Sequence, residues 1–241
     1  MSITIYINHI AMIEELINKF PQFSFVKRVK IKKNNTFTMT HEFLSSQTEQ
    51  IYPIQVLFIG KTGYGKSTTL NRIVGQEVFE TDDVCSCTKE MYEVSYCIDK
   101  KKKTFLTFND MPGIGESLKA DEQYYEWYEN MISCSECIVY VLRADQRDYS
   151  WDDKVFRKFL KKCKKQVIIA LNCADKIEPI NRKEGLSTEQ ILNLKAKVKR
   201  LSTLFGIPQK NIVYYSAKDE INMGLLMEKI AYVISDSMEN H

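Results

Sequence analysis

The sequence has no long hydrophobic run and no marked excess of charge of one sign. No stretch reaches the roughly 18 apolar residues that a transmembrane helix needs, and the first residues lack the basic and apolar regions of a signal peptide. We therefore expect a cytoplasmic protein without a transmembrane segment. Lysine and arginine total 34 against 31 aspartates and glutamates. The resulting net charge of +3 does not by itself indicate a nucleic-acid partner.

Histidine is scarce as well, which bears on metal binding. The chain has three histidines and seven cysteines, and the two nearest cysteines are Cys85 and Cys87. Zinc sites usually combine two such pairs, or one pair with nearby histidines. We therefore expect reduced cysteines that serve mostly as small core residues.

One stretch carries a phosphate-binding motif. Residues 60–67 form G-K-T-G-Y-G-K-S, which fits G-x-x-x-x-G-K-[ST], between a strand-like run at 54–59 and a helical pattern that Gly75 can end. Glycines let backbone N–H groups approach a phosphate, and the helix N-terminus adds positive partial charge. Lys66 can reach the β- and γ-phosphates, and the Ser67 hydroxyl can bind Mg²⁺. The predicted nucleotide contacts here are Lys61, Thr62, Gly63, Tyr64, Gly65, Lys66, Ser67 and Thr68.

A second motif, D-M-P-G, ends a later predicted strand. Asp110 can hold the water shell of Mg²⁺, and the N–H of Gly113 can face the γ-phosphate, where a side chain would be too bulky. A simple turn is the alternative explanation for D-x-P-G alone. Its place at a strand end favours the nucleotide role, because ligands of parallel sheets bind at the carboxyl ends of the strands.

A third motif, N-C-A-D, ends another strand and points to guanine. The Asp175 carboxylate can accept hydrogen bonds from the guanine ring N–H and from its exocyclic amine, whereas adenine offers no such pair of donors. Asn172 would tie this loop to the phosphate loop, and Lys176 is a further predicted nucleotide contact. An Asn- and Asp-rich loop is the alternative.

A fourth, weaker motif follows the last predicted strand. It consists of Ser216, Ala217 and Lys218. The N–H of Ala217 can contact the guanine carbonyl, and the stem of Lys218 can cover the base.

From residue 54 onward, predicted strands alternate with predicted helices. The strands are apolar or β-branched runs at 54–59, 91–98, 104–109, 137–142, 166–171 and 211–215. Helical periodicity predicts helices at 119–133 and 151–164. A third helix begins at a capping box formed by Ser187 and Gln190, and a last helix carries Leu226 and Ile230. This order is typical of an α/β fold. We expect a mostly parallel six-stranded sheet with one antiparallel edge strand and helices on both faces.

These ordered motifs resemble those of a P-loop GTPase G domain, over about residues 54–238. Within that class the chain is similar to the Era-like branch (the TrmE–Era–EngA–septin class), near bacterial GTPases of the 50S-ribosome-binding type and, more distantly, to immunity-related GTPases. The resemblance implies GTP and GDP as ligands and Mg²⁺ as cofactor. It implies a G domain over 51–241 and an N-terminal extension over 1–50. Within that extension, residues 3–7 and 36–40 have strand character, and 10–20 has helical periodicity.

A switch threonine is expected in the polar stretch 81–89. The resemblance assigns Thr88, with Thr81 and Ser86 as alternatives. A threonine hydroxyl there completes the Mg²⁺ shell when the γ-phosphate is bound. The implied catalytic residues are Lys66, Thr88 and Gly113, and the implied metal ligands are Ser67, Thr88 and Asp110.

Three residues depart from the family pattern. Cys173 stands where the base motif usually has lysine, which alters packing over the base. Ile114 stands where other GTPases hold a water-positioning glutamine, so backbone groups, a bound cation or a partner must position water. Gly63 replaces the asparagine of the K⁺-dependent members, and K⁺ stimulation is not expected.

The resulting functional prediction is a GTP-binding switch with slow, Mg²⁺-dependent hydrolysis of GTP to GDP and phosphate. One alternative is a self-assembling, dynamin-like or immunity-type GTPase that G-domain dimerisation or an activating protein stimulates. Another is a ribosome- or RNA-associated GTPase, with phosphate contacts from basic stretches at 27–33, 100–103 and 161–165. We favour solvated surfaces for these stretches. An ATP kinase fits poorly, because adenine lacks the second donor for Asp175.

Overall fold

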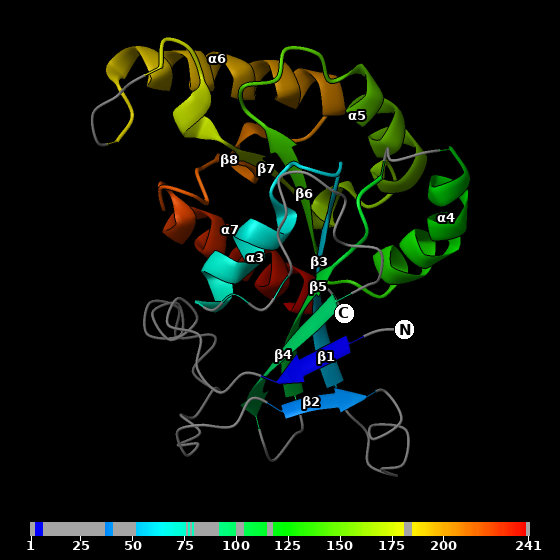
Figure 1. The fold of residues 1–241 in the computed structure, drawn as a ribbon. Helices are drawn as coiled ribbons and strands as arrows, with labels where there is room; N and C mark the ends of the chain where they lie inside the picture. The colour runs from blue at the N-terminus through cyan, green and yellow to red at the C-terminus, as the bar shows by residue number, and fades with distance from the viewer. Residues whose placement is uncertain are drawn as a thin grey trace.

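The fold is an α/β arrangement with helices on both faces of one sheet (Figure 1). In the computed structural model, the described residues are 3–6, 37–40, 52–75, 77, 79, 92–99, 104–114, 118–180 and 185–239. The strands are β1 (Ile3–Tyr6), β2 (Phe37–Thr40), β3 (Tyr52–Gly60), β4 (Tyr92–Asp99), β5 (Thr104–Asp110), β6 (Cys137–Arg143), β7 (Val167–Asn172) and β8 (Ile212–Tyr214).

The apolar run before the phosphate loop forms β3, which lies inside the sheet. Val56, Leu57, Phe58 and Ile59 have no exposed surface, as expected for a strand covered on both faces. β3 pairs in parallel with β5 on one side and with β6 on the other. The C-terminal ends of these three neighbouring strands therefore meet at one edge, where the motifs lie.

The predicted six-stranded arrangement is confirmed. β3, β5, β6, β7 and β8 run parallel, and β4 pairs antiparallel with β5. The full strand order is β2-β1-β4-β5-β3-β6-β7-β8.

The position of the antiparallel strand differs from the prediction, because two N-terminal strands extend the sheet beyond it. β1 pairs in parallel with β4, and β2 pairs antiparallel with β1. β4 therefore lies inside the sheet. An unpaired strand edge readily takes up another strand, and residues 3–6 supply one. The predicted helix at 10–20 lies outside the described residues, and the division of the chain at residue 50 stays a prediction.

Among the described residues, two helices cover one face of the sheet and three cover the other. α3 (Lys66–Val74) and α7 (Met223–Glu239) lie on one side, and α4 (Leu118–Ser133) and α5 (Ser150–Val155) on the opposite side (Figure 1). α6 (Thr188–Phe205) shares the side of α5, because Phe205 lies 4.9 Å from Phe156 between ring centroids. Within the described ranges, no helix is both long enough and apolar enough to cross a membrane.

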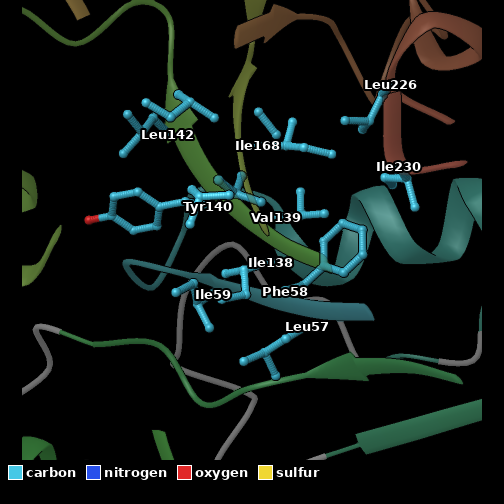
Figure 2. Close-up of a cluster of buried hydrophobic side chains, with 14 of the residues drawn as sticks. Leu57, Phe58, Ile59, Ile138, Val139, Tyr140, Leu142, Ile168, Leu226 and Ile230 are labelled. Atoms are coloured by element: carbon cyan, nitrogen blue, oxygen red, sulfur yellow. The ribbon is translucent and has the colours of Figure 1, made fainter. Parts of the chain in front are cut away.

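Alternate residues of β6 serve the two core layers. Tyr140 points toward the layer of Phe156 and Phe205, with ring centroids 6.3 Å from each. Figure 2 shows Tyr140 on one side of the strand, with Leu226 and Ile230 of α7 on the other. This alternation follows from the two-residue period of a strand.

The helix predicted at 151–164 is interrupted. After α5 the chain forms a π-helical segment, η2 (Phe156–Leu160), which brings Phe156, Phe159 and Leu160 into the core. The predicted capping box of α6 is present, because Ser187 Oγ accepts from Gln190 N at 3.1 Å and Gln190 Oε1 accepts from Ser187 N at 3.0 Å. The short 3₁₀ segments are η3 (Lys164–Gln166), η4 (Ala174–Lys176) and η5 (Gln209–Asn211).

Candidate nucleotide-binding site

The phosphate loop, residues 61–65, joins β3 to α3 and depends on its glycines. Gly63 and Gly65 have φ angles of 76° and 86°, which other residues rarely adopt. A Cβ atom on Gly65 would lie 2.3 Å from Asn172 Nδ2. Because Gly65 has no side chain to cap α3, the first N–H groups of that helix can serve an anion.

Lys66 places a cation beside this loop. It is the first residue of α3, only 5% of it is exposed, and its ammonium group donates to the Gly60 carbonyl at 3.3 Å. The ammonium group therefore lies along the start of the loop, where it can pair with the oxygens of a bound phosphate.

Ser67 and Asp110 meet at the predicted magnesium position. The Ser67 hydroxyl donates to Asp110 Oδ2 at 2.6 Å. Within the described part of the chain, Asp110 Oδ1 is buried without a hydrogen-bond partner. Burial raises the pKa of Asp110 to about 6, against the opposing effects of Lys66 and the Ser67 hydrogen bond. A hydroxyl and a carboxylate oxygen lacking a donor are hard ligands, so these two residues fit Mg²⁺.

The D-M-P-G turn packs directly on the phosphate loop. A Cβ atom on Gly113 would lie 2.0 Å from Thr62 Oγ1 and 2.7 Å from Thr62 N. Ile114 N donates to the Gly60 carbonyl at 3.3 Å, and Ile114 forms a parallel bridge with Lys61. The Ile114 side chain is buried, with 3% exposed. Only glycine allows this close approach of the two segments.

Asn172 connects three of the motifs. Its Nδ2 donates to the Tyr64 carbonyl at 3.0 Å, and its Oδ1 accepts from Ala217 N at 3.1 Å. The structure thus brings the base motif against the phosphate loop, as the sequence predicted for Asn172, and against the segment that begins at Ser216.

The rest of the base motif forms a tight turn at the end of β7. Cys173 has φ 59° and ψ 38°, a left-handed conformation that turns the chain into η4. Asp175 is partly exposed and Lys176 is exposed. Gln190 of α6 holds this turn by donating to the Asp175 carbonyl at 3.1 Å.

The segment 216–218 lies beside α3. Ser216 and Ala217 are buried, while Lys218 is exposed. Arg72 Nε donates to the Ala217 carbonyl at 3.1 Å and Arg72 Nη1 lies 2.9 Å from Glu220. Local sequence patterns do not predict these contacts of Arg72, because its partners are distant in the sequence.

The predicted switch residue cannot be placed in this site. Thr88 and its alternatives, Thr81 and Ser86, lie outside the described residues. Every other predicted site residue lies in the phosphate loop, in the first turn of α3, at the last residue of β5 or β7, or in the segments that follow β5, β7 and β8.

Comparison with known families agrees with this arrangement. A family model described as a 50S ribosome-binding GTPase matches residues 55–173. That range includes the phosphate loop, the D-x-P-G turn and the start of the base motif. The chain carries a P-loop GTPase domain.

Curated relatives of this GTPase domain are longer proteins. YfjP from Escherichia coli (strain K12), itself uncharacterized, is 31% identical over 148 residues, which cover 61% of the chain and 50% of YfjP. GTPase Der from Persephonella marina is 27% identical over 188 residues, covering 76% of the chain and 39% of Der. The chain thus spans about half or less of the length of these relatives.

Solved structures share the fold of the GTPase domain. Era, in a complex with MgGDPNP and a segment of 16S ribosomal RNA, superposes with a TM-score of 0.60 at 23% identity, covering 76% of the chain and 57% of Era. A dimerization-deficient mutant of Toc33 from Arabidopsis thaliana superposes with a TM-score of 0.60 at 18% identity, covering 94% of the chain and 93% of Toc33.

Proposed function

We propose that this protein binds GTP and GDP together with Mg²⁺, hydrolyses GTP slowly, and acts as a nucleotide-controlled switch. The observation that carries this proposal is the meeting of Lys66, Ser67 and Asp110 at the loop between β3 and α3. The base motif lies against the same loop through Asn172. One ligand with phosphates at one end and guanine at the other fits such a site.

The phosphate end of the ligand would be held by the loop and by Lys66. The N–H groups at the start of α3 and the Lys66 ammonium group offset phosphate charge. Ser67 and Asp110 would hold Mg²⁺. When bound, Mg²⁺ neutralises charge that develops on the phosphate oxygens during hydrolysis.

The base end would select guanine through Asp175. Its partly exposed carboxylate can accept from both guanine donors. The N–H of the buried Ala217 donates to Asn172 Oδ1 in this structure, and it would exchange that bond for one to the guanine carbonyl when nucleotide binds. Cys173 offers no long stem to cover the base, and we assign that role to Lys218.

The switch would be the contact between the D-M-P-G turn and the phosphate loop. Gly113 touches Thr62, and Ile114 is paired with Lys61. A γ-phosphate that takes a hydrogen bond from Gly113 must lie between these segments and separate them. Binding of GTP and of GDP would therefore favour different positions of the turn.

The decisive experiment measures the nucleotide and its turnover together. Nucleotide retained on the purified protein is identified by mass, and GTP hydrolysis is followed with and without Mg²⁺. We expect GDP or GTP on the protein and slow, Mg²⁺-dependent release of phosphate. Binding of ATP in preference to GTP, or no nucleotide binding at all, would contradict the proposal.

A second candidate is a GTPase that assembly activates. Dimerization is described as important for the GTPase activity of Toc33 and Toc159. Two structures of Toc33 share the fold over 94% and 95% of the chain. In the present protein, turnover per molecule that rises with protein concentration would favour this candidate. An association with ribosomal RNA, as in the Era complex, would instead appear as RNA binding that weakens steeply with salt.

A further inference from the structure

Tyr64 is the largest side chain of the phosphate loop, and it turns into the protein. Only 6% of the residue is exposed. Its hydroxyl donates to Gln146 Oε1 at 2.5 Å and lies 3.4 Å from Asp152 Oδ2. Its carbonyl accepts from Asn172 at 3.0 Å. The loop is therefore held at this residue by both its side chain and its backbone.

The partner of Tyr64 is a buried carboxylate. Asp152 lies in α5 with no exposed surface. Gln146 Nε2 donates to Asp152 Oδ2 at 3.2 Å, and the Tyr140 hydroxyl lies 3.3 Å from Asp152 Oδ1. Polar groups from the phosphate loop, β6 and the segment after β6 thus converge on one side chain.

A second contact joins the same two segments. Lys61 at the start of the loop places its ammonium nitrogen 5.6 Å from the ring centroid of Trp151, the neighbour of Asp152 in α5. Both long side chains between Gly60 and Gly65 therefore reach α5, and the loop is fixed to that helix at two points.

The burial of Asp152 is unfavourable for the fold alone. Burial raises the pKa of Asp152 from 3.8 to about 6, although Tyr140, Gln146 and Tyr64 all donate to the ionised form. At neutral pH the carboxylate is therefore less stable in the protein than in water. A buried charge that lowers stability, in contact with a ligand-binding loop, indicates a role in that loop.

We propose that Tyr64 and Asp152, bridged by Gln146, are positioning residues that hold the phosphate loop in the shape that binds nucleotide phosphates. This inference rests on the proposed function, because it requires that the loop bind a guanine nucleotide. The N–H groups of the loop can then donate to the phosphates without an entropy cost for ordering the loop, and this increases the affinity for nucleotide. Neither side chain touches the nucleotide.

The first test removes the two groups separately and together. In Tyr64→Phe the hydroxyl is lost, and in Asp152→Asn one acceptor oxygen becomes a donor. We expect each variant of the full chain to bind GDP about tenfold more weakly at pH 7.5, as expected for a lost hydrogen bond to a charged group. Because the residues act as a unit, the double variant should be no weaker than the weaker single variant. The preference for GDP over ADP should not change.

The matched control is Tyr149→Phe. Tyr149 is also buried, with 1% exposed, and it also lies near Asp152, but its hydroxyl donates to the Arg143 carbonyl at 2.6 Å and not to Asp152 or Gln146. We expect its GDP affinity to equal that of the unmodified protein. A general loss of stability would instead weaken all the variants alike.

The second test uses pH, which a purely structural role would not link to affinity. The groups that face Asp152 are Lys61 and Tyr64 of the loop, Tyr140 of β6 and Tyr149 before α5, and Arg143 acts on Tyr64. We divide the GDP affinity of the unmodified protein by that of Asp152→Asn. This ratio should rise as pH increases from 5 to 8, with its midpoint near pH 6. Asp110 and the nucleotide titrate in both proteins, so their effects on affinity cancel in this ratio.

The outcomes separate this inference from the proposed function. If the unmodified protein binds no guanine nucleotide, the proposed function fails. If it binds GDP, and Tyr64→Phe binds as tightly with a flat pH ratio for Asp152→Asn, the inference is overturned while the function stands. Should Asp152→Asn fail to fold, Tyr64→Phe against Tyr149→Phe still decides the question through affinity.

Discussion

Lys66 lies where the phosphate loop becomes α3, and its ammonium group is turned toward the loop. Replacing it with alanine removes the cation that we expect to face the β- and γ-phosphates. We expect Lys66→Ala to reduce GTP affinity by about 100-fold or more, since charge-assisted contacts to phosphate are strong. The fold should survive, because the residue is at a loop–helix junction.

Nucleotide titration by calorimetry, with circular dichroism as a check on folding, measures this effect. Lys229→Ala is the control, because that lysine is partly buried but lies on α7 beside Tyr232. GTP affinity unchanged in Lys66→Ala would remove the basis of the phosphate-loop assignment.

We expect Asp175 to determine which base the site accepts. An asparagine there offers one acceptor and one donor, which suits the extra carbonyl of xanthine better than the amine of guanine. We therefore expect Asp175→Asn to bind XDP more tightly than GDP, whereas the unmodified protein prefers GDP. Competition between the two nucleotides gives the ratio directly, and a retained guanine preference would mean that another residue selects the base.

Asp152 should make the stability of the protein depend on pH. Its pKa in the folded protein, about 6, is above its ordinary value of 3.8, so the folded state binds the proton more tightly than the unfolded state. Its contribution to stability is present below pH 4 and is lost as pH rises through 6. The unfolding free energy of Asp152→Asn, relative to the unmodified protein, should therefore rise by about 2 kcal/mol between pH 4 and pH 7.

Urea denaturation at several pH values tests this, because Asp110, which also titrates near 6, is present in both proteins. A difference that stays constant with pH would show that Asp152 keeps its ordinary pKa in the folded state.

Among the elements, the turn after β5 packs closely on the phosphate loop. A methyl group at Gly113 would overlap Thr62 at 2.0 Å from its hydroxyl oxygen. We expect Gly113→Ala to push the turn away from the loop and to weaken GTP binding more than GDP binding, by about tenfold, because only GTP has the γ-phosphate that this N–H would serve.

The affinities for GDP and for a non-hydrolysable GTP analogue measure the difference. Gly224→Ala is a suitable control, because a Cβ atom there meets nothing within 4 Å. An equal loss of affinity for both nucleotides would indicate that the turn affects the loop only through general packing.

The elements that local patterns define were predictable from the sequence. The buried runs of β3, β6 and β7 and the capping box of Ser187 each depend on neighbouring residues, and all four are confirmed. The break of the α5 helix into η2 was not predictable, because the basic and apolar residues at 156–160 keep an ordinary helical pattern.

Contacts between distant segments could not be predicted from the sequence, for a related reason. Tyr64 meets Asp152 across 88 positions of the chain, and Arg72 meets Ala217 across 145. No motif spans such distances, so only the packing of α3 and α5 around the sheet brings these residues together. The pairing of β1 with β4 is of the same kind, and it placed β4 inside the sheet.

For the molecule as a whole, the rate of hydrolysis is the main functional expectation. Ile114 is buried and has no polar side-chain group to orient water, so Lys66, Mg²⁺ and backbone groups must stabilise the transition state. We expect dilute protein to turn over GTP at about 10⁻⁴ to 10⁻³ s⁻¹, the range of GTPases without an activator. A second copy or a partner protein would then supply the missing group.

Phosphate release, followed over a range of protein concentrations with the oligomeric state measured in parallel, tests this expectation. Ile114→Ala should keep the basal rate, since the side chain points into the core. Fast turnover in a verified monomer would show that the site is complete without a partner.

The pairing of β1 with β4 also affects how the chain is made. Ile3 of β1 lies opposite Tyr92 of β4, so β1 leaves the ribosome nearly ninety residues before its parallel partner. At ordinary rates of translation that interval is on the order of ten seconds, whereas strands pair in microseconds once both are present. During that time β2 can pair with one edge of β1, while the other edge of β1 stays unpaired and is open to binding by a chaperone.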